Sequence, residues 1–157
     1  MTWLSFPFEN AQQALLIYIL ITWLLWSIVM LPPKIVRVSS LYMGARGLAL
    51  PGFLFILHEE PESTVHHELT HVLQMRRYSP LGVGLYLGWH YGKGFVQQKL
   101  AGQPLDFWAL WRKNPLEIEA CEKMQAGVSP LHYPWSSIVG LLCHSLLLAL
   151  CVFYMYG

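Results

Sequence analysis

Charged residues are scarce in this sequence. Asp, Glu, Lys and Arg make up 12% of its 157 residues, whereas 55% are apolar. Soluble domains carry about a quarter charged residues, so this composition argues against an ordinary soluble protein, and the length fits one domain. The net charge of +1 gives no basic excess for a phosphate backbone, and we expect no nucleic-acid partner.

Cysteine is also scarce. The sequence has three, and no two of them are spaced as C-x-x-C. An odd count without that spacing argues against a disulfide framework and against a cysteine-based metal site. Two of the three, Cys143 and Cys151, lie in an apolar segment near the end of the sequence.

Two long segments lack charged residues altogether. The first is Ala11–Pro33, and its core, Ala14–Leu31, approaches the roughly 20 apolar residues that a helix needs to cross hydrocarbon. The second is Tyr133–Gly157, which contains the apolar stretch Ile138–Tyr156 with aromatic residues near its ends. The sequence therefore predicts two transmembrane helices in contact with the lipid bilayer.

A cleaved signal peptide is the alternative for the first segment. No Lys or Arg precedes that segment, however, and its apolar run exceeds the about 7 to 15 residues of such a peptide. All ten Lys and Arg lie between the two segments, so the positive-inside rule places the central region in the cytoplasm. We expect an N-terminal segment and first span in residues 1–33, a central module in 34–132 and a second span in 133–157.

Turn and cap residues divide the central module. Leu48–Leu57 is too short to cross a membrane as a helix and contains a Pro-Gly pair, which predicts a strand or hairpin. Ser63 is a suitable N-cap for a helix from Thr64 to about Arg77. Asn114, followed by Pro, indicates the start of another helix, which ends at Gly127.

The segment between these helices is rich in glycine. Residues 81–103 have weak periodicity, which predicts one short helix at most. Leu105–Lys113 has the composition of a helix.

The helix predicted from Thr64 carries an H-E-x-x-H sequence, His67-Glu68-Leu69-Thr70-His71. Residues four apart lie on one helical face, so His67 and His71 can both present a ring nitrogen to one metal ion. Glu68 lies about 100° around the helix from His67, within reach of a water molecule on that ion, which fits a general base. The opposite face carries apolar residues with helical spacing, which we expect to be buried: Val65, Leu69, Val72 and Leu73.

A catalytic zinc site usually has three protein ligands and a water molecule. Glu117 and Glu119 are the candidates for the third ligand. On a helical wheel Glu117 falls among apolar residues, where a carboxylate is costly unless it is paired or bound to a metal. Glu119 falls beside charged residues and is expected to face solvent. We therefore expect Glu117 to be the ligand and keep Glu119 as the fallback; alternatively, Glu117 completes a capping box with Asn114.

These motifs resemble those of the gluzincin metallopeptidases, especially membrane-integral proteases of the HtpX type and small uncharacterised bacterial metallopeptidases. The resemblance rests on His67-Glu68-x-x-His71, Glu117 and Ala120, and extends over about residues 47–127. It implies Zn²⁺ bound by two histidines and a glutamate, a water activated by Glu68, and hydrolysis of a protein or peptide substrate that pairs along Leu48–Leu57. Many gluzincins place Asp or Asn four residues after the ligand glutamate to support a histidine, where this sequence has Cys121.

The remaining histidines have weaker functional signals. His90 and Tyr91 could donate hydrogen bonds to the oxyanion of a tetrahedral intermediate, although polar loop residues without a role are commoner. His66 is expected to be solvated or to cap the helix. His144 lies in the second span, where an ionisable residue is either functional or hydrogen-bonded within or between helices.

We therefore predict a mainly α-helical membrane protein in which two transmembrane helices flank a small zincin-like α+β module with a short β hairpin or strand. Its expected function is zinc-dependent endopeptidase activity near the membrane surface. The alternative is a non-catalytic, metal-stabilised interaction or scaffold module that contacts a membrane partner protein. The presence of Glu68 argues against that alternative, because a structural zinc site needs no base.

Overall fold

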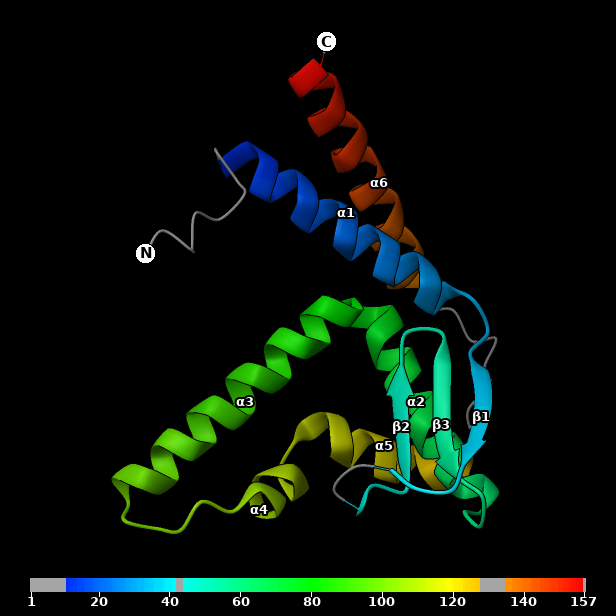
Figure 1. Ribbon diagram of the computed structural model, residues 1–157, viewed down its shortest axis with the longest axis vertical. Coiled ribbons are helices and arrows are strands. Elements are labelled where there is room, and N and C mark those ends of the chain that lie inside the picture. The colour runs from blue at the N-terminus through cyan, green and yellow to red at the C-terminus, as the bar shows by residue number, and fades with distance from the viewer. Residues whose placement is uncertain (1–10, 42–43, 128–134, 157) are drawn as a thin grey trace, which may run out of the picture.

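The computed structural model describes residues 11–41, 44–127 and 135–156. The fold is mostly helical and has one small sheet, in agreement with the prediction (Figure 1). Its helices are α1 (Ala11–Met30), α2 (Glu62–Tyr78), α3 (Pro80–Leu100), α4 (Phe107–Arg112), α5 (Pro115–Ala126) and α6 (Trp135–Tyr156). Its strands are β1 (Lys34–Val38), β2 (Gly47–Leu50) and β3 (Phe53–Leu57).

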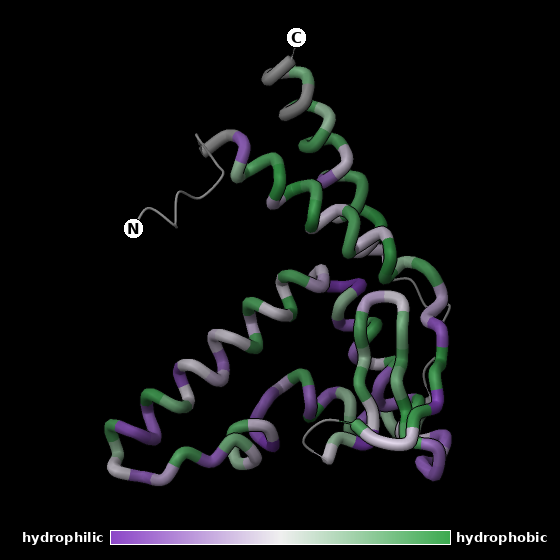
Figure 2. Tube along the Cα trace, viewed as in Figure 1, coloured by the Kyte–Doolittle hydropathy of each residue, from purple (hydrophilic) through white to green (hydrophobic). Residues whose placement is uncertain are grey.

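Helices α1 and α6 lie side by side and project away from the rest of the fold (Figure 1). Both are mostly apolar along their length (Figure 2). Among the described residues, one helix has the length and composition to cross a membrane, α1 over Gln13–Met30. The apolar stretch found in α6, Ser137–Leu150, is shorter.

The two helices pack through aromatic rings of α1 set against small and polar residues of α6. The Trp26 indole lies directly against Gly140, where a Cβ atom would overlap the ring. The rings of Trp26 and His144 meet edge to face with centroids 5.2 Å apart, and Trp23 Nε1 donates to Ser145 Oγ at 2.8 Å. His144 Nδ1 is 3.0 Å from the Gly140 carbonyl oxygen, so the imidazole makes the hydrogen bond within its own helix that was one of its two expected roles.

The predicted hairpin is present as β2 and β3, joined at Pro51-Gly52, and Gly52 has a φ of 81° that glycine adopts without strain. A third strand, β1, was not predicted and pairs in parallel with β3. Because the strand order is β1-β3-β2, β2 forms an edge of the sheet. The β-branched residues Ile35, Val36 and Val38 were the available sequence signal for β1, but the segment is only five residues long.

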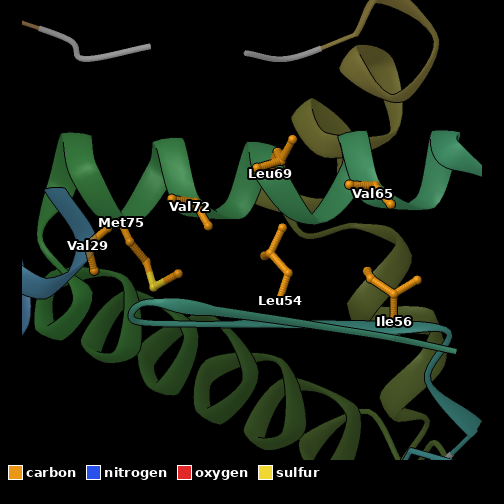
Figure 3. Packing of buried hydrophobic residues seen from close by; sticks show 7 residues of the cluster. All are labelled: Val29, Leu54, Ile56, Val65, Leu69, Val72 and Met75. Carbon is orange, nitrogen blue, oxygen red and sulfur yellow. The ribbon is translucent and has the colours of Figure 1, made fainter. Parts of the chain in front are cut away.

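Helix α2 packs its apolar face onto the sheet (Figure 3). The buried stripe predicted for this helix is confirmed: Val65, Leu69, Val72 and Leu73 are all buried. In Figure 3, Leu54 and Ile56 of β3 point from the sheet toward α2. The helix begins two residues earlier than predicted, at Glu62, with extended Pro61 as its N-cap in place of Ser63. Proline suits this position because its fixed φ leads the chain into the first turn and its missing N–H is not required there.

The prediction for the glycine-rich segment was wrong, because α3 is a continuous helix of 21 residues. Each helical glycine costs about 1 kcal/mol relative to alanine, but close packing offsets that cost where α3 meets α4. Gly94 lies against the Leu110 side chain, which leaves no space for a Cβ atom. Ser79 Oγ caps the helix start by accepting from the Gly82 N–H at 3.0 Å. Helix α4 is somewhat shorter than the predicted Leu105–Lys113, because Asp106 caps its start.

Arg76 joins α2 to the end of α1 and is fully buried. Its Nε donates to the Val29 carbonyl at 2.9 Å and its Nη2 to the Leu31 carbonyl at 3.2 Å. In return, Trp26 Nε1 donates to the Arg76 carbonyl at 2.9 Å. The last carbonyls of a helix have no partner within the helix and carry partial negative charge, so a buried guanidinium is well placed there. The motif helix is thereby fixed to the apolar helix α1.

Candidate metal centre

Three potential metal ligands converge where α2 meets α5. His67 and His71 lie one turn apart on α2, and Glu117 lies in the first turn of α5. The Nε2 atoms of the two histidines are 3.2 Å apart. Glu117 Oε2 is 3.4 Å from His67 Nε2 and 3.5 Å from His71 Nε2. The predicted ligands are thus brought together, and α5 begins and ends as predicted, with Asn114 as its N-cap and Gly127 as its C-cap.

The spacing of these atoms fits a tetrahedral zinc ion. Zinc bonds to imidazole nitrogen and carboxylate oxygen are about 2.0–2.1 Å long, so tetrahedral geometry separates two ligand atoms by about 3.3 Å. All three distances lie close to that value. Glu117 Oε2 is also buried without a hydrogen-bond partner among the described residues, which is costly for a carboxylate unless a cation compensates it. The donor set of two imidazoles and one carboxylate is one that zinc uses.

Gln74 fixes the orientation and tautomer of His71. Its Nε2 donates to the Leu116 carbonyl at 2.8 Å and to Glu119 Oε2 at 3.0 Å, so its amide oxygen must face His71. The His71 Nδ1 atom is 2.8 Å from that oxygen and therefore carries the proton. The Nε2 lone pair of His71 is thereby left free to point at the centre. Gln74 was not predicted from the sequence, although its position three residues after His71 on the helix was an available signal.

Replacing Gln74 should weaken metal binding without removing a ligand. We expect Gln74→Leu to raise the dissociation constant for zinc about 10- to 100-fold, the usual effect of losing the partner of a ligating histidine. Competition with a chromogenic chelator measures this constant. The matched control is Gln97→Leu, a change at an exposed position of α3. An unchanged constant in Gln74→Leu would show that Gln74 does not position His71.

Two further residues of α5, Glu119 and Cys121, lie near the three ligands but are not among them. Glu119 is half-buried rather than turned to solvent, and besides Gln74 it contacts Lys123 at 2.7 Å and Arg77 at 3.4 Å. Burial opposes the ionisation of Glu119, but the hydrogen bonds from Lys123 and Gln74 lower its pKa below the ordinary value. Cys121 Sγ lies 4.0 Å from His67 Nδ1. The thiol is therefore a weak hydrogen-bonding neighbour of His67.

Glu68 lies beside the three ligands and is not one of them. Its carboxylate is buried between α2 and β2 and accepts a hydrogen bond from the Ala49 backbone N–H. Burial raises the pKa of Glu68 above its ordinary value, although the charges of His71 and His67 oppose the shift. A carboxylate with a raised pKa is better matched to proton transfer near neutral pH.

Gly47 provides the space that Glu68 occupies. A Cβ atom at this position would be 2.5 Å from Glu68 Oε1. Any larger residue at position 47 would therefore displace the Glu68 carboxylate from its place beside the histidines. The sequence offered no signal for this contact, because it joins two segments whose relative position depends on the fold.

Glu117 and His71 shift each other's pKa values toward the charged forms. Burial opposes ionisation of Glu117, but its contacts with His67 and His71 and their positive charges prevail and lower its pKa to about 2. Burial by itself would lower the pKa of His71, yet the contact with Glu117 outweighs burial and raises it. A negative carboxylate close to two imidazoles is an arrangement that attracts a cation.

A cavity of about 730 Å³ opens above the ligands. His67, Glu68, His71 and Glu117 all lie on its wall. The edge strand β2 lines one side, and side chains of α3, α4 and α5 line the others. Most of its lining is apolar and includes Leu48, Met75, Leu87, Trp108, Trp111 and Leu116. The volume is within the range of small-molecule and peptide-binding clefts.

His90 and Tyr91 do not line this cavity. Both face α4 and α5: His90 Nε2 is 3.3 Å from the Leu110 carbonyl oxygen, and Tyr91 accepts from Asn114 Nδ2 at 3.4 Å. The Tyr91 ring also stacks on Phe107 with centroids 5.0 Å apart. In this structure the two residues connect α3 to its neighbours. Their expected contact with an oxyanion has no support in this placement.

No protein-family model, curated protein or solved structure matches this chain. The gluzincin resemblance therefore remains a prediction based on two short motifs. What the structure adds is the placement of those motifs in one site.

Proposed function

We propose that this chain is a membrane-anchored zinc endopeptidase. The observation that carries the proposal is the convergence of His67, His71 and Glu117 at the distances of a tetrahedral zinc site, with Glu68 buried beside them. Three protein ligands leave a coordination position for water, which is typical of catalytic rather than structural zinc. The large cavity above the ligands provides room for a substrate.

Each group has a defined role in peptide hydrolysis. Zinc held by His67, His71 and Glu117 would lower the pKa of a water molecule and polarise the substrate carbonyl. Glu68 accepts a proton from the attacking water and later gives it to the amine of the departing product. Gln74 keeps the Nδ1 proton of His71 in place throughout.

The edge strand suggests how a peptide would be held. Leu57 donates to the Arg46 carbonyl and Leu48 pairs with Phe55. Because bonded pairs alternate along an antiparallel ladder, the backbone groups of Gly47 and Ala49 face away from β3. The Ala49 N–H is already bonded to Glu68, so the Gly47 N–H and the two carbonyls are the groups open to a substrate. An extended substrate can add to this edge, with its side chains in the apolar cavity. Burial of the Glu68 carboxylate beside that edge favours catalysis over the scaffold alternative, because a purely structural zinc site has no use for a costly buried carboxylate.

We further propose that α6 is a second membrane span and that the module lies in the cytoplasm. The close packing of α6 on α1 supports the first point, since the ring of Trp26 fits against Gly140. Exposed leucines along α6, including Leu142, Leu146 and Leu150, would face lipid. The second point rests on the location of all ten Lys and Arg between the two apolar segments.

Metal content per chain tests the proposed site. We expect about one zinc ion per chain in detergent-purified protein by elemental analysis. The variants His71→Ala and Glu117→Ala should each lose most of it, whereas Glu122→Ala, an exposed change on the same helix as Glu117, should retain it. Wild-type protein without metal would exclude the peptidase. Zinc retained in Glu117→Ala would exclude Glu117 as the third ligand.

A further inference from the structure

Helix α3 has two opposite faces with different surroundings. One face carries Leu87, which lines the cavity, and Gly94, which packs on Leu110. The opposite face carries large apolar residues that are mostly exposed: Leu85, Trp89, Val96 and Leu100, with exposed fractions of 62%, 71%, 58% and 84%. At 100° per residue these four residues fall within one narrow arc, which we call the outer face of α3. Four large apolar side chains in a single exposed stripe exceed the scattered apolar residues that are normal at a protein surface.

The outer face is continuous with the part of the protein that meets the membrane. Helix α3 begins at Pro80, directly after α2, whose Arg76 binds the carbonyl of Leu31 just beyond the end of α1. Helices α1 and α3 are also in contact. The start of α3 is therefore level with the end of the apolar stretch of α1. From there α3 extends sideways, away from the α1–α6 pair, and does not run alongside it (Figure 1).

The polar residues of α3 complement a lipid surface. The helix has no Asp or Glu, and its two charged residues are Lys93 and Lys99. By helix geometry they lie on opposite sides of the outer face, and both are exposed. Lysines in this position can extend to phosphate groups while the apolar residues between them enter the acyl region. Trp89, at the centre, is a residue type enriched at membrane interfaces.

We propose that α3 is an interfacial helix whose outer face lies in the headgroup–acyl boundary of the membrane that α1 crosses. This assigns the bilayer a third contact with the chain, distinct from α1 and α6. Because the opposite face of the same helix lines the cavity, α3 lies between the bilayer and the site. If the proposed peptidase function holds, the substrates are polypeptide segments that emerge from the membrane surface beside α3.

A second copy of the chain is the alternative to lipid as the partner of the outer face of α3. Gly84, Gly88 and Gly92 are spaced by four, and a Cβ atom at any of them would meet no other atom within 4 Å. Spacing of this kind allows two helices to approach closely. The lysines distinguish the two occupants, because a second α3 has no Asp or Glu and would offer them no counter-charge. Anionic lipid headgroups attract them instead.

Spin labels at the outer face test the proposal. The full chain, with Cys121→Ser, Cys143→Ser and Cys151→Ser, is labelled at Trp89→Cys or Val96→Cys and reconstituted in vesicles of phosphatidylcholine and phosphatidylglycerol. The matched control is Gln97→Cys, which is exposed next to Val96 but turned about 100° away. Collision rates with oxygen, which concentrates in lipid, and with a water-soluble nickel chelate are then compared by electron paramagnetic resonance.

We expect oxygen to exceed the nickel chelate several-fold at positions 89 and 96, and the reverse at position 97. Leu100→Cys replaces Trp89→Cys if that variant fails to fold. Nickel accessibility at positions 89 and 96 equal to that at 97 would place the outer face in water and overturn the proposal. Spin–spin broadening at 89 and 96 with low access to both agents would identify a second copy instead. None of these measurements depends on zinc or on hydrolysis, so failure of the proposed enzyme leaves the result interpretable.

Discussion

Glu68→Gln should abolish most peptide hydrolysis and leave the zinc content unchanged. Glutamine has nearly the same size and can still accept the hydrogen bond from the Ala49 N–H, so the packing against Gly47 is preserved. It cannot take a proton from water, however. Loss of a general base lowers rates by about 10²- to 10⁴-fold. The measurement is kcat/KM on a fluorogenic peptide rich in apolar residues, together with zinc per chain.

The control for this variant is Glu62→Gln, an exposed change in the first turn of the same helix. It should leave both zinc content and kcat/KM unchanged. Retained hydrolysis in Glu68→Gln would remove Glu68 from the mechanism and leave the activity unexplained. Absence of hydrolysis in the wild type, with zinc bound, would favour the metal-stabilised scaffold.

Arg76→Met should destabilise the fold clearly more than the same change at a partly exposed arginine. Methionine retains the apolar stem but donates no hydrogen bond, so the carbonyls of Val29 and Leu31 lose a partner. An unsatisfied buried polar group costs about 1–3 kcal/mol. Val29 is fully buried whereas Leu31 is exposed, so we expect a loss of about 1–3 kcal/mol, mainly from the Val29 carbonyl. Denaturant unfolding in detergent, followed by circular dichroism, measures the change.

Arg77→Met is the matched control, because Arg77 is adjacent in sequence but its side chain is 36% exposed and contacts Glu119 at 3.4 Å. An ion pair of this kind contributes about 0–1 kcal/mol. Equal effects from the two changes would contradict the role assigned to Arg76, since they would indicate a general dependence on positive charge at the end of α2.

Local signals in the sequence were sufficient for several parts of the structure. Pro51-Gly52 between two apolar runs predicted the hairpin, and Asn114-Pro115 predicted the start of α5. Helical periodicity placed His67 and His71 on one face, and the apolar wheel position of Glu117 identified the residue that joins them. In each case the deciding information lay within a few neighbouring residues.

The remaining features depend on contacts between distant segments. The glycines of α3 favour a loop by intrinsic propensity, and the tight contact of Gly94 with Leu110 that offsets this cannot be read from the sequence. Gln74 acquires its role only because α5 places Glu119 and the Leu116 carbonyl against it. The burial of Arg76 likewise requires the end of α1 as its acceptor. Propensity and spacing carry no information about such partners.

If the candidate centre binds a cation, the buried Arg76 would link that binding thermodynamically to α1. His71 and Arg76 belong to one continuous helix, little more than one turn apart, so docking of α1 and ordering of the ligands share a structural element. Linkage is reciprocal: if docking of α1 raises the affinity of the centre for a cation by some factor, binding of the cation raises the affinity for α1 by the same factor. Detergents that loosen α1 would therefore release metal, and chelators would loosen α1.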